Sequence, residues 1–127
     1  MPSADTLERF IARVESNAHA EAIDEFYTED ASMRENMKEP RRGRALLMER
    51  ERKTLARARS VKSTCVRPAL VSGPIVVLRW IFEFEWLDGR SSRLEELSYQ
   101  RWEGERVAEE QFFYDPAQVA PPKPPGA

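Results

Sequence analysis

The sequence predicts an α+β fold in which helices come first and an antiparallel sheet follows. In the first half, apolar residues recur at helical spacing, as in Leu7, Phe10, Ile11 and Val14, which gives one apolar stripe along a helix. In the second half, long segments rich in alternating apolar and polar residues are separated by glycine-containing turns, which is typical of antiparallel hairpins. Helices segregated from an antiparallel sheet define the α+β class.

Three helices and one short strand are expected in the first half. A capping box at Asp5–Glu8 opens the first helix. A short second helix follows, on which His19 and Phe26 share one face. The segment "DASMREN" (30–36) alternates briefly and predicts a short strand. A third helix is expected over about 44–59, after the chain breaks at a proline and a glycine.

The second half is expected to form long strands joined by tight turns. Pro68 lies within the first of them, and its missing N–H predicts an edge position or a bulge. Glycines at 73, 89 and 104 mark the turns between successive strands. The expected strands cover residues 60–72, 75–87, 91–102 and 106–115.

Length and composition limit the classes of function. The 127 residues predict one domain over 1–116 and a proline-rich tail over 117–127. A net charge of −2 argues against a nucleic-acid partner. One histidine and one cysteine argue against a metal site. The sequence shows no apolar run of membrane-spanning length and no signal-peptide pattern, so we expect no membrane partner and a cytoplasmic location.

Alternation along the last two strands gathers polar and aromatic side chains on one face. Glu110 shares a face with Phe112 and Tyr114, whereas Glu109 points the other way. On the preceding strand, Glu96 lies on the same face as Gln100 and Trp102. A carboxyl group among apolar side chains has a raised pKa and can act as an acid or a base. An ion pair, for example with Arg79 or Arg101, is the alternative role for these polar groups.

Four strings in order resemble the NTF2-like superfamily and its SnoaL-like, polyketide cyclase-like branch. They are "EFYTEDASM", "RRGRALL", "VVLRWIFEF" and "GERVAEEQFFYDPA", and the resemblance covers about residues 6–117. It implies a cone in which a strongly curved antiparallel sheet wraps around three N-terminal helices. The superfamily includes isomerases, cyclases, hydrolases, dehydratases and non-catalytic binding modules, so the fold alone does not fix the activity.

The resemblance allows known chemistries of the superfamily to be compared residue by residue. The catalytic base of steroid isomerases of this fold falls on Glu35, but the acid falls on Ser98 and the tyrosine near Phe10. Ile81 and Phe112 stand where the epoxide hydrolases need aspartates, and Phe112 also replaces the terminal-strand acid of the polyketide cyclases. Steroid isomerisation and epoxide hydrolysis are therefore not expected.

The orientation of the 75–87 strand is ambiguous in the sequence. Hydrophobicity predicts that its aromatic face points to the core. Counting residues back from the hairpin, by analogy with the family, instead places the opposite face, which begins at Arg79, on the cavity wall. We follow this count. The aromatic face would then lie on the outside of the sheet and form a homodimer interface. That face carries Trp80, Phe82, Phe84 and Trp86, with Leu97 and Tyr99 on the neighbouring strand.

The sequence thus predicts a cofactor-free protein that binds a small, mostly apolar organic ligand in the cone. Proton transfer by cavity carboxyl groups would make it an isomerase, cyclase or lyase, and a non-catalytic binding or assembly module is the alternative. Glu35 and Asn36 could alternatively lie in a solvated loop. Tyr27 and Met33 could alternatively pack in the core. The candidate catalytic residues are Glu35, Glu96 and Glu110, and the candidate ligand-binding residues are Tyr27, Met33, Asn36, Gln100, Trp102, Phe112 and Tyr114.

Overall fold

The structure is a computed structural model that describes residues 1–119. Its helices are α1 (Ala4–Glu15), α2 (His19–Phe26) and α3 (Arg44–Ala56), followed near the end by a short 3-10 turn, η1 (Pro116–Gln118). One sheet has the strand order β2-β1-β6-β5-β4-β3. Its strands are β1 (Tyr27–Glu35), β2 (Arg41–Arg42), β3 (Ala58–Ser72), β4 (Ile75–Trp86), β5 (Ser91–Glu103) and β6 (Arg106–Phe113). The predicted α+β class is confirmed.

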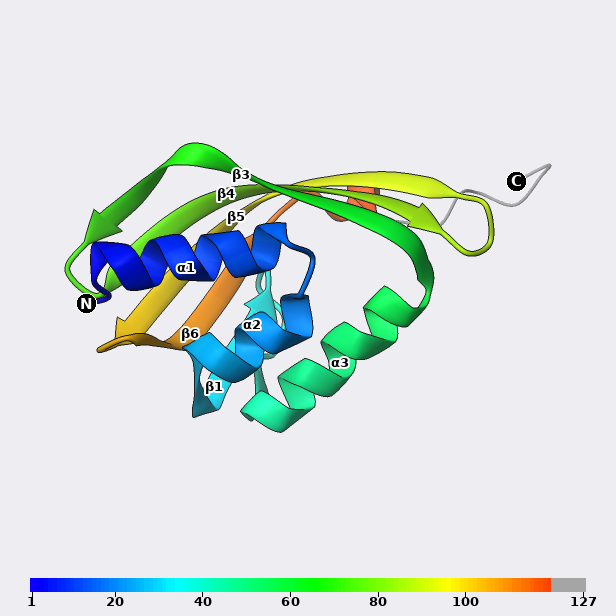
Figure 1. The fold of residues 1–127 in the computed structure, drawn as a ribbon. Helices are drawn as coiled ribbons and strands as arrows, with labels where there is room; N and C mark the ends of the chain where they lie inside the picture. The colour runs from blue at the N-terminus through cyan, green and yellow to red at the C-terminus, as the bar shows by residue number, and fades with distance from the viewer. Residues whose placement is uncertain (120–127) are drawn as a thin grey trace.

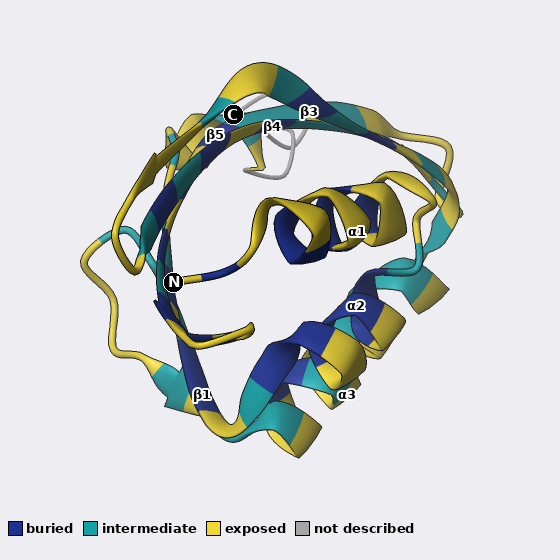
Figure 2. Ribbon diagram, turned by 60° about the vertical axis from the view of Figure 1, so that its left-hand side comes forward, coloured by how far each residue is buried: buried dark blue, intermediate teal, exposed yellow. Residues whose placement is uncertain are grey.

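The sheet is strongly curved and the helices lie within its curve. In Figure 1 the long strands β3, β4 and β5 arch over α1. Figure 2, turned from that view, shows the sheet wrapping around α1, with α2 and α3 on the opposite side. This arrangement is the cone that the resemblance implies. None of the three helices is long and apolar enough to cross a membrane.

Helix α1 buries the predicted apolar stripe, but its cap differs from the prediction. Leu7, Phe10, Ile11 and Val14 are all buried. The N-cap is Ser3, whose Oγ accepts a hydrogen bond from the N–H of Thr6 at 3.1 Å. The predicted capping box, which starts two residues later at Asp5, is therefore wrong. The acidic residue at position 5 lies instead in the first turn, where negative charge favours the helix dipole.

Strand pairing confirms the hairpins and adds one parallel pair. The edge strand β3 contains Pro68, and its register with β4 shifts between Val66 and Leu70, as the missing donor predicts. Strands β3 to β6 pair antiparallel in sequence order. Strand β1 pairs parallel with β6, which needs a long connection, and α3 with β3 to β5 supplies it. The sheet is therefore mixed rather than purely antiparallel.

The orientation predicted for β4 is wrong. Trp80 is buried and Phe82 packs against the core, whereas Arg79 on the opposite face is exposed. Hydrophobic alternation decides the face, and a count by analogy that slips by one residue inverts every side chain. Leu97 pairs with Arg79 and therefore lies on the outer face of the sheet, opposite to Trp80. The exposed aromatic stripe expected as a dimer interface does not exist.

Candidate functional site

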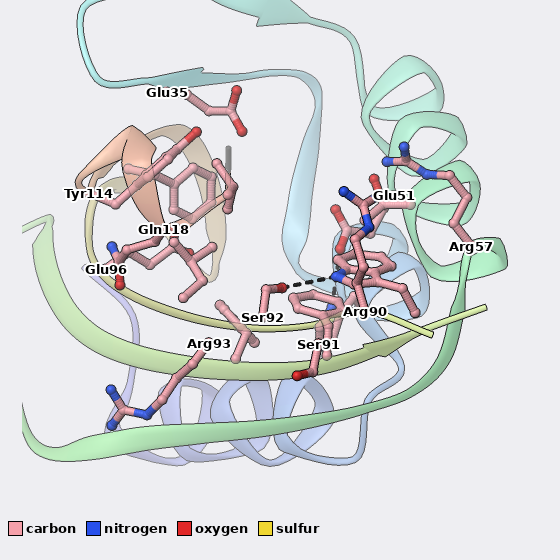
Figure 3. A pocket seen from close by; sticks show the side chains of 18 of the residues that line it. Glu35, Glu51, Arg57, Arg90, Ser91, Ser92, Arg93, Glu96, Tyr114 and Gln118 are labelled. Carbon is pink, nitrogen blue, oxygen red and sulfur yellow. Dashed lines mark hydrogen bonds and ion pairs between the residues drawn. The ribbon is translucent and has the colours of Figure 1, made fainter. Parts of the chain in front are cut away.

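A cavity of about 920 Å³ opens at the end of the cone. Its walls come from the inner faces of β4 and β5, the end of α3, the end of β1, and the segment after β6. Figure 3 shows Glu35 and Tyr114 on one side of it, and Glu51 of α3 and Arg57, which follows α3, on the other. A second cavity of about 70 Å³ lies further into the core and shares His19, Glu51 and Phe112 with the first.

Aromatic side chains of β4 form one wall of the larger cavity. Phe82, Phe84 and Trp86 line it because they alternate onto the inner face of the strand. Phe84 and Trp86 stack with ring centroids 4.5 Å apart. The indole of Trp86 donates a hydrogen bond to Ser92 Oγ at 3.0 Å, and the Arg57 guanidinium lies 5.9 Å from a Trp86 ring. The wall is therefore apolar inside and fixed by polar contacts at its rim.

Glu96 presents a buried carboxyl group to this cavity. It lines the cavity from β5, and the residue is only 8% exposed. Within residues 1–119 its carboxyl group makes no hydrogen bond or ion pair. Burial raises the pKa of Glu96 to about 8, with further contributions from the charges of Glu110, Glu51 and Glu35. At neutral pH this group is mostly protonated and can donate a proton or a hydrogen bond.

Glu110 is also buried but is fully engaged by neighbouring side chains. Its Oε1 accepts a hydrogen bond from the hydroxyl of Tyr27. Its Oε2 accepts from Ser98 Oγ and from Gln100 Nε2, each at 2.6 Å. The indole of Trp102 donates to Gln100 Oε1 at 3.0 Å. Burial raises the pKa of Glu110 and raises that of Tyr27 well above its usual range.

The arginines considered as partners for these carboxyl groups lie on the outer face of the sheet. Arg79 donates to Glu95 at 2.9 Å. Arg101 pairs with Glu103 and Glu109 at 3.1 Å and 3.2 Å. The ion-pair alternative for Glu96 and Glu110 is therefore wrong, and the prediction that Glu109 points outward is confirmed.

A pair of groups that the sequence analysis did not connect lies between α2 and α3. His19 Nδ1 is 3.1 Å from Glu51 Oε1, and its Nε2 is 2.7 Å from Ser63 Oγ. Ser63 donates its own proton to Asn17 Oδ1 at 2.9 Å, so it accepts a hydrogen bond from His19 Nε2. A proton can therefore be shared between Nδ1 and the Glu51 carboxylate at the cavity wall. Glu51 lies four residues after buried Leu47, a helical spacing that could have placed it on the inner face.

The mouth of the cavity holds Glu35 and Tyr114. Glu35 pairs with Arg41 at 3.8 Å. Burial, and then the charge of Glu35, raises the pKa of Tyr114 to about 12. Asn36 adopts a positive φ of 50°, its N–H donates to Phe112 O, and its Oδ1 accepts from the Tyr114 N–H at 3.0 Å. Asn36 therefore fixes the end of β1 against β6 and is not a solvated loop residue.

The structure divides the predicted site residues among three places. Glu35, Glu96, Phe112 and Tyr114 line the larger cavity. Tyr27, Met33 and Glu110 line the smaller one, together with Phe112. Three predicted ligand-binding residues line neither cavity and act behind the walls instead: Asn36, Gln100 and Trp102.

This arrangement suits proton transfer. A carboxyl group that keeps its proton at neutral pH and a histidine–carboxylate pair face the same cavity. Groups whose environments separate their proton affinities can serve as acid and base in one reaction. No cluster of three or more metal-ligating side chains occurs within residues 1–119.

Comparison with known proteins gives a family and a fold. A family model described as SnoaL-like domain matches residues 7–110. A comparison with curated proteins gave no match.

Solved structures with the same fold share little sequence with this chain. A Mesorhizobium loti protein, provisionally described as a SnoaL-like polyketide cyclase, is 18% identical over 90% of this chain and 100% of its own, with a TM-score of 0.74. An NTF2-like protein of unknown function from Burkholderia pseudomallei is 13% identical over 91% and 92%, with a TM-score of 0.76. A hypothetical Catenulispora acidiphila protein with a ketosteroid isomerase-like fold, in complex with trimethylamine, is 15% identical over 92% and 90%, with a TM-score of 0.76. These identities support a shared fold only.

Proposed function

Because this chain belongs to the SnoaL-like domain family, we propose that it binds a small, mostly apolar organic molecule in the cone and transfers protons to and from it. The observation that carries this proposal is Glu96, a buried and unpartnered carboxyl group on the wall of an aromatic cavity. A concave cavity of this size, with an aromatic wall and polar groups at fixed positions, is typical of small-molecule sites.

The proton transfer is assigned to two groups on opposite walls. Glu96 holds its proton at neutral pH and gives it to an oxygen or nitrogen of the bound molecule. The His19–Glu51 pair accepts a proton from another position of that molecule. Protonation at one position and deprotonation at another can drive isomerisation, cyclisation or elimination of the bound molecule without a cofactor. Glu110 holds Tyr27, Ser98 and Gln100 in place and is assigned a supporting role.

The alternative is a binding module without catalysis. This alternative is supported by the sequence, which lacks residues that each of the activities compared above requires. Ser98, Ile81 and Phe112 stand at the positions of the required acids. The cavity would then retain a ligand, and Glu96 would only hydrogen-bond to it.

Binding is tested by mass spectrometry of small molecules that copurify with the native protein. Leu94→Trp adds a large ring to the lining of the cavity and should deplete the copurified molecule. Leu97→Trp adds the same ring on the outer face and should leave it unchanged. Equal retention by both variants would contradict binding in the cone.

Catalysis is tested with the molecule so identified, by NMR in deuterated water. We expect the protein to convert it or to exchange its carbon-bound hydrogen for deuterium, and Glu96→Gln should slow this about a hundredfold or more. Glu95→Gln, one residue away on the outer face, is the matched control. Retention without conversion or exchange would establish the binding module instead.

A further inference from the structure

Four glutamate carboxyl groups lie along the two cavities inside the cone. Glu35, Glu51 and Glu96 line the larger cavity and Glu110 lines the smaller one. The three of the larger cavity come from β1, α3 and β5, whereas Glu110 comes from β6 and is held by hydrogen bonds from Tyr27, Ser98 and Gln100. The neighbouring carboxylates are close enough to act on Glu96, since their charges add to burial in raising its pKa.

Glu35 pairs with Arg41 and Glu51 lies 3.1 Å from His19, but the basic side chains that line the larger cavity do not pair with Glu96. Arg90 pairs with Asp88 at 2.7 Å in the β4–β5 turn. Arg93 pairs with Glu95 on the outer face, and in Figure 3 its side chain points away from the cavity. Arg57 lies against Trp86 at the end of α3. His19 faces Glu51 and Ser63. Within residues 1–119, therefore, no arginine or lysine contacts Glu96.

We propose that the ligand is an amine carried on an apolar body, and that Glu96 is the counter-ion of its ammonium group. This inference rests on the proposed function, that the cavity binds a small organic molecule. An amine that enters as the free base takes the proton from the Glu96 carboxyl group. One that enters as ammonium displaces that proton to solvent, and both routes end in the same ammonium–carboxylate pair. The aromatic wall of Phe82, Phe84 and Trp86 then covers the apolar part.

The other classes of ligand fit these groups less well. An organic anion would gain no ion pair from Glu96 and would lie near the carboxylates of Glu35 and Glu51, where like charges repel at low dielectric. A neutral alcohol or ketone would make one hydrogen bond to Glu96, whereas an ammonium group makes a charge-assisted bond of about twice the strength. A bound cation would also be stabilised by the charges of the neighbouring carboxylates, although only Glu96 would contact it.

The test uses three probes of one shape, namely naphthylmethylamine, naphthylmethanol and naphthoate. Their dissociation constants for the native protein are measured at pH 7 by NMR, and shifts of the Trp86 indole N–H and of Phe112 locate the site. We expect the amine to bind at least about tenfold more tightly than the alcohol, and the naphthoate most weakly. This comparison needs no variant, so it stands even if a substitution at position 96 fails to fold.

Two variants then assign the counter-ion. Glu96→Gln should reduce amine affinity about tenfold or more and change alcohol affinity little, since it removes one charge at constant shape. Glu95→Gln should change neither affinity. An alcohol that binds as tightly as the amine, a preference for naphthoate, or an amine preference that survives Glu96→Gln would overturn the inference while leaving cavity binding intact. If no probe binds at millimolar concentration, the inference is contradicted, whereas the proposed function is decided separately by the copurified molecule.

Discussion

At the scale of single residues, the last two strands show how much alternation alone can predict. The period of two places Glu110 with Phe112 inside the sheet and Glu109 outside, and the structure has this arrangement. Alternation could not show which of the inner carboxyl groups has its hydrogen bonds satisfied by other side chains of the protein. Ser98 and Gln100 on β5 both donate to Oε2 of Glu110, and that depends on strand register rather than on the pattern of either strand.

Glu110 and Glu109 should differ sharply in their contribution to stability. Glu110→Gln replaces an acceptor of three hydrogen bonds by an amide, so buried donors lose partners. The expected cost is about 1–3 kcal/mol in the free energy of unfolding, measured by urea denaturation at pH 7. Glu109→Gln on the exposed face should stay within about 0.5 kcal/mol. Equal losses would mean that the register of β6 is shifted by one residue.

Glu96 should make stability fall as pH rises. Its ordinary pKa is 4.5, and burial raises the pKa in the folded state to about 8. The folded protein therefore binds this proton more strongly than the unfolded chain, so the contribution is complete below pH 4.5 and is lost as pH rises towards 8. Glu96→Gln, which stays neutral, should be more stable than the native protein at pH 8.5 by a margin on the order of a few kcal/mol.

The comparison should be made by urea denaturation from pH 4.5 to pH 8.5. Glu35, His19, Glu51, Glu110 and Tyr114 lie in the same cone and remain in both proteins, so the difference reports the proton of Glu96 together with its coupling to the charges of Glu110, Glu51 and Glu35. The control is Glu95→Gln, because Arg79 lowers the pKa of Glu95 and moves its titration below this range. A stability difference that does not change with pH would contradict the raised pKa of Glu96.

At the scale of elements, the long hairpins were predictable and the contacts between distant elements were not. Alternation and turn glycines located β4, β5 and β6 to within a few residues. The parallel pairing of β1 with β6 joins segments about 80 residues apart, and no local pattern encodes it. The meeting of α2 with α3, which brings His19 to Glu51, is likewise a product of tertiary packing. The missed part of the candidate site therefore lies where elements meet.

The short η1 turn should anchor the last described residues to β5. Gln118 Oε1 accepts from the Glu95 N–H at 2.9 Å, and its Nε2 donates to Glu95 O at 3.1 Å. Gln118→Ala should lower stability by about 1 kcal/mol, or about 4 °C in Tm for a domain of this size. Both Gln118 and Val119 line the larger cavity, so the same change should weaken binding of any cavity probe.

Truncation of the predicted proline-rich tail provides a comparison for the Gln118→Ala change. Gln118 and Val119 belong to its first residues, and its remainder, 120–127, lies outside the described residues. The composition of that remainder predicts that truncation after Val119 leaves Tm unchanged. A loss of several degrees on truncation would show that the prediction of a dispensable end is wrong.

At the scale of the whole molecule, the cone followed from the resemblance, but the roles of its two surfaces did not. The sequence of one strand does not determine the volume of a cavity. Nor does counting along it reliably determine which face lines the cavity, because a shift of one residue exchanges the inner and outer faces. The aromatic residues of β4, expected outside, form the cavity wall. A dimer of this protein therefore needs another surface.

The outer face of the sheet supplies one, and we expect the protein to be a homodimer through it. Leu97 and Tyr99 are each 46% exposed, and neighbouring apolar side chains extend them across β3, β4 and β6. This outer-sheet patch consists of Leu70, Val77, Ile81, Leu97, Tyr99 and Phe113. Burying apolar surface contributes about 25 cal/mol per Å², which favours pairing of two such patches.

Light scattering at micromolar concentration tests this expectation. The native protein should have the mass of two chains, and Leu97→Asp should have the mass of one, because it places a charge at the centre of the patch. Leu46→Asp makes the same change on an exposed position of α3, away from the sheet, and should leave the dimer intact. A native mass of one chain would exclude the dimer. If Leu46→Asp also dissociated the protein, the interface would involve the helices instead of the outer face of the sheet.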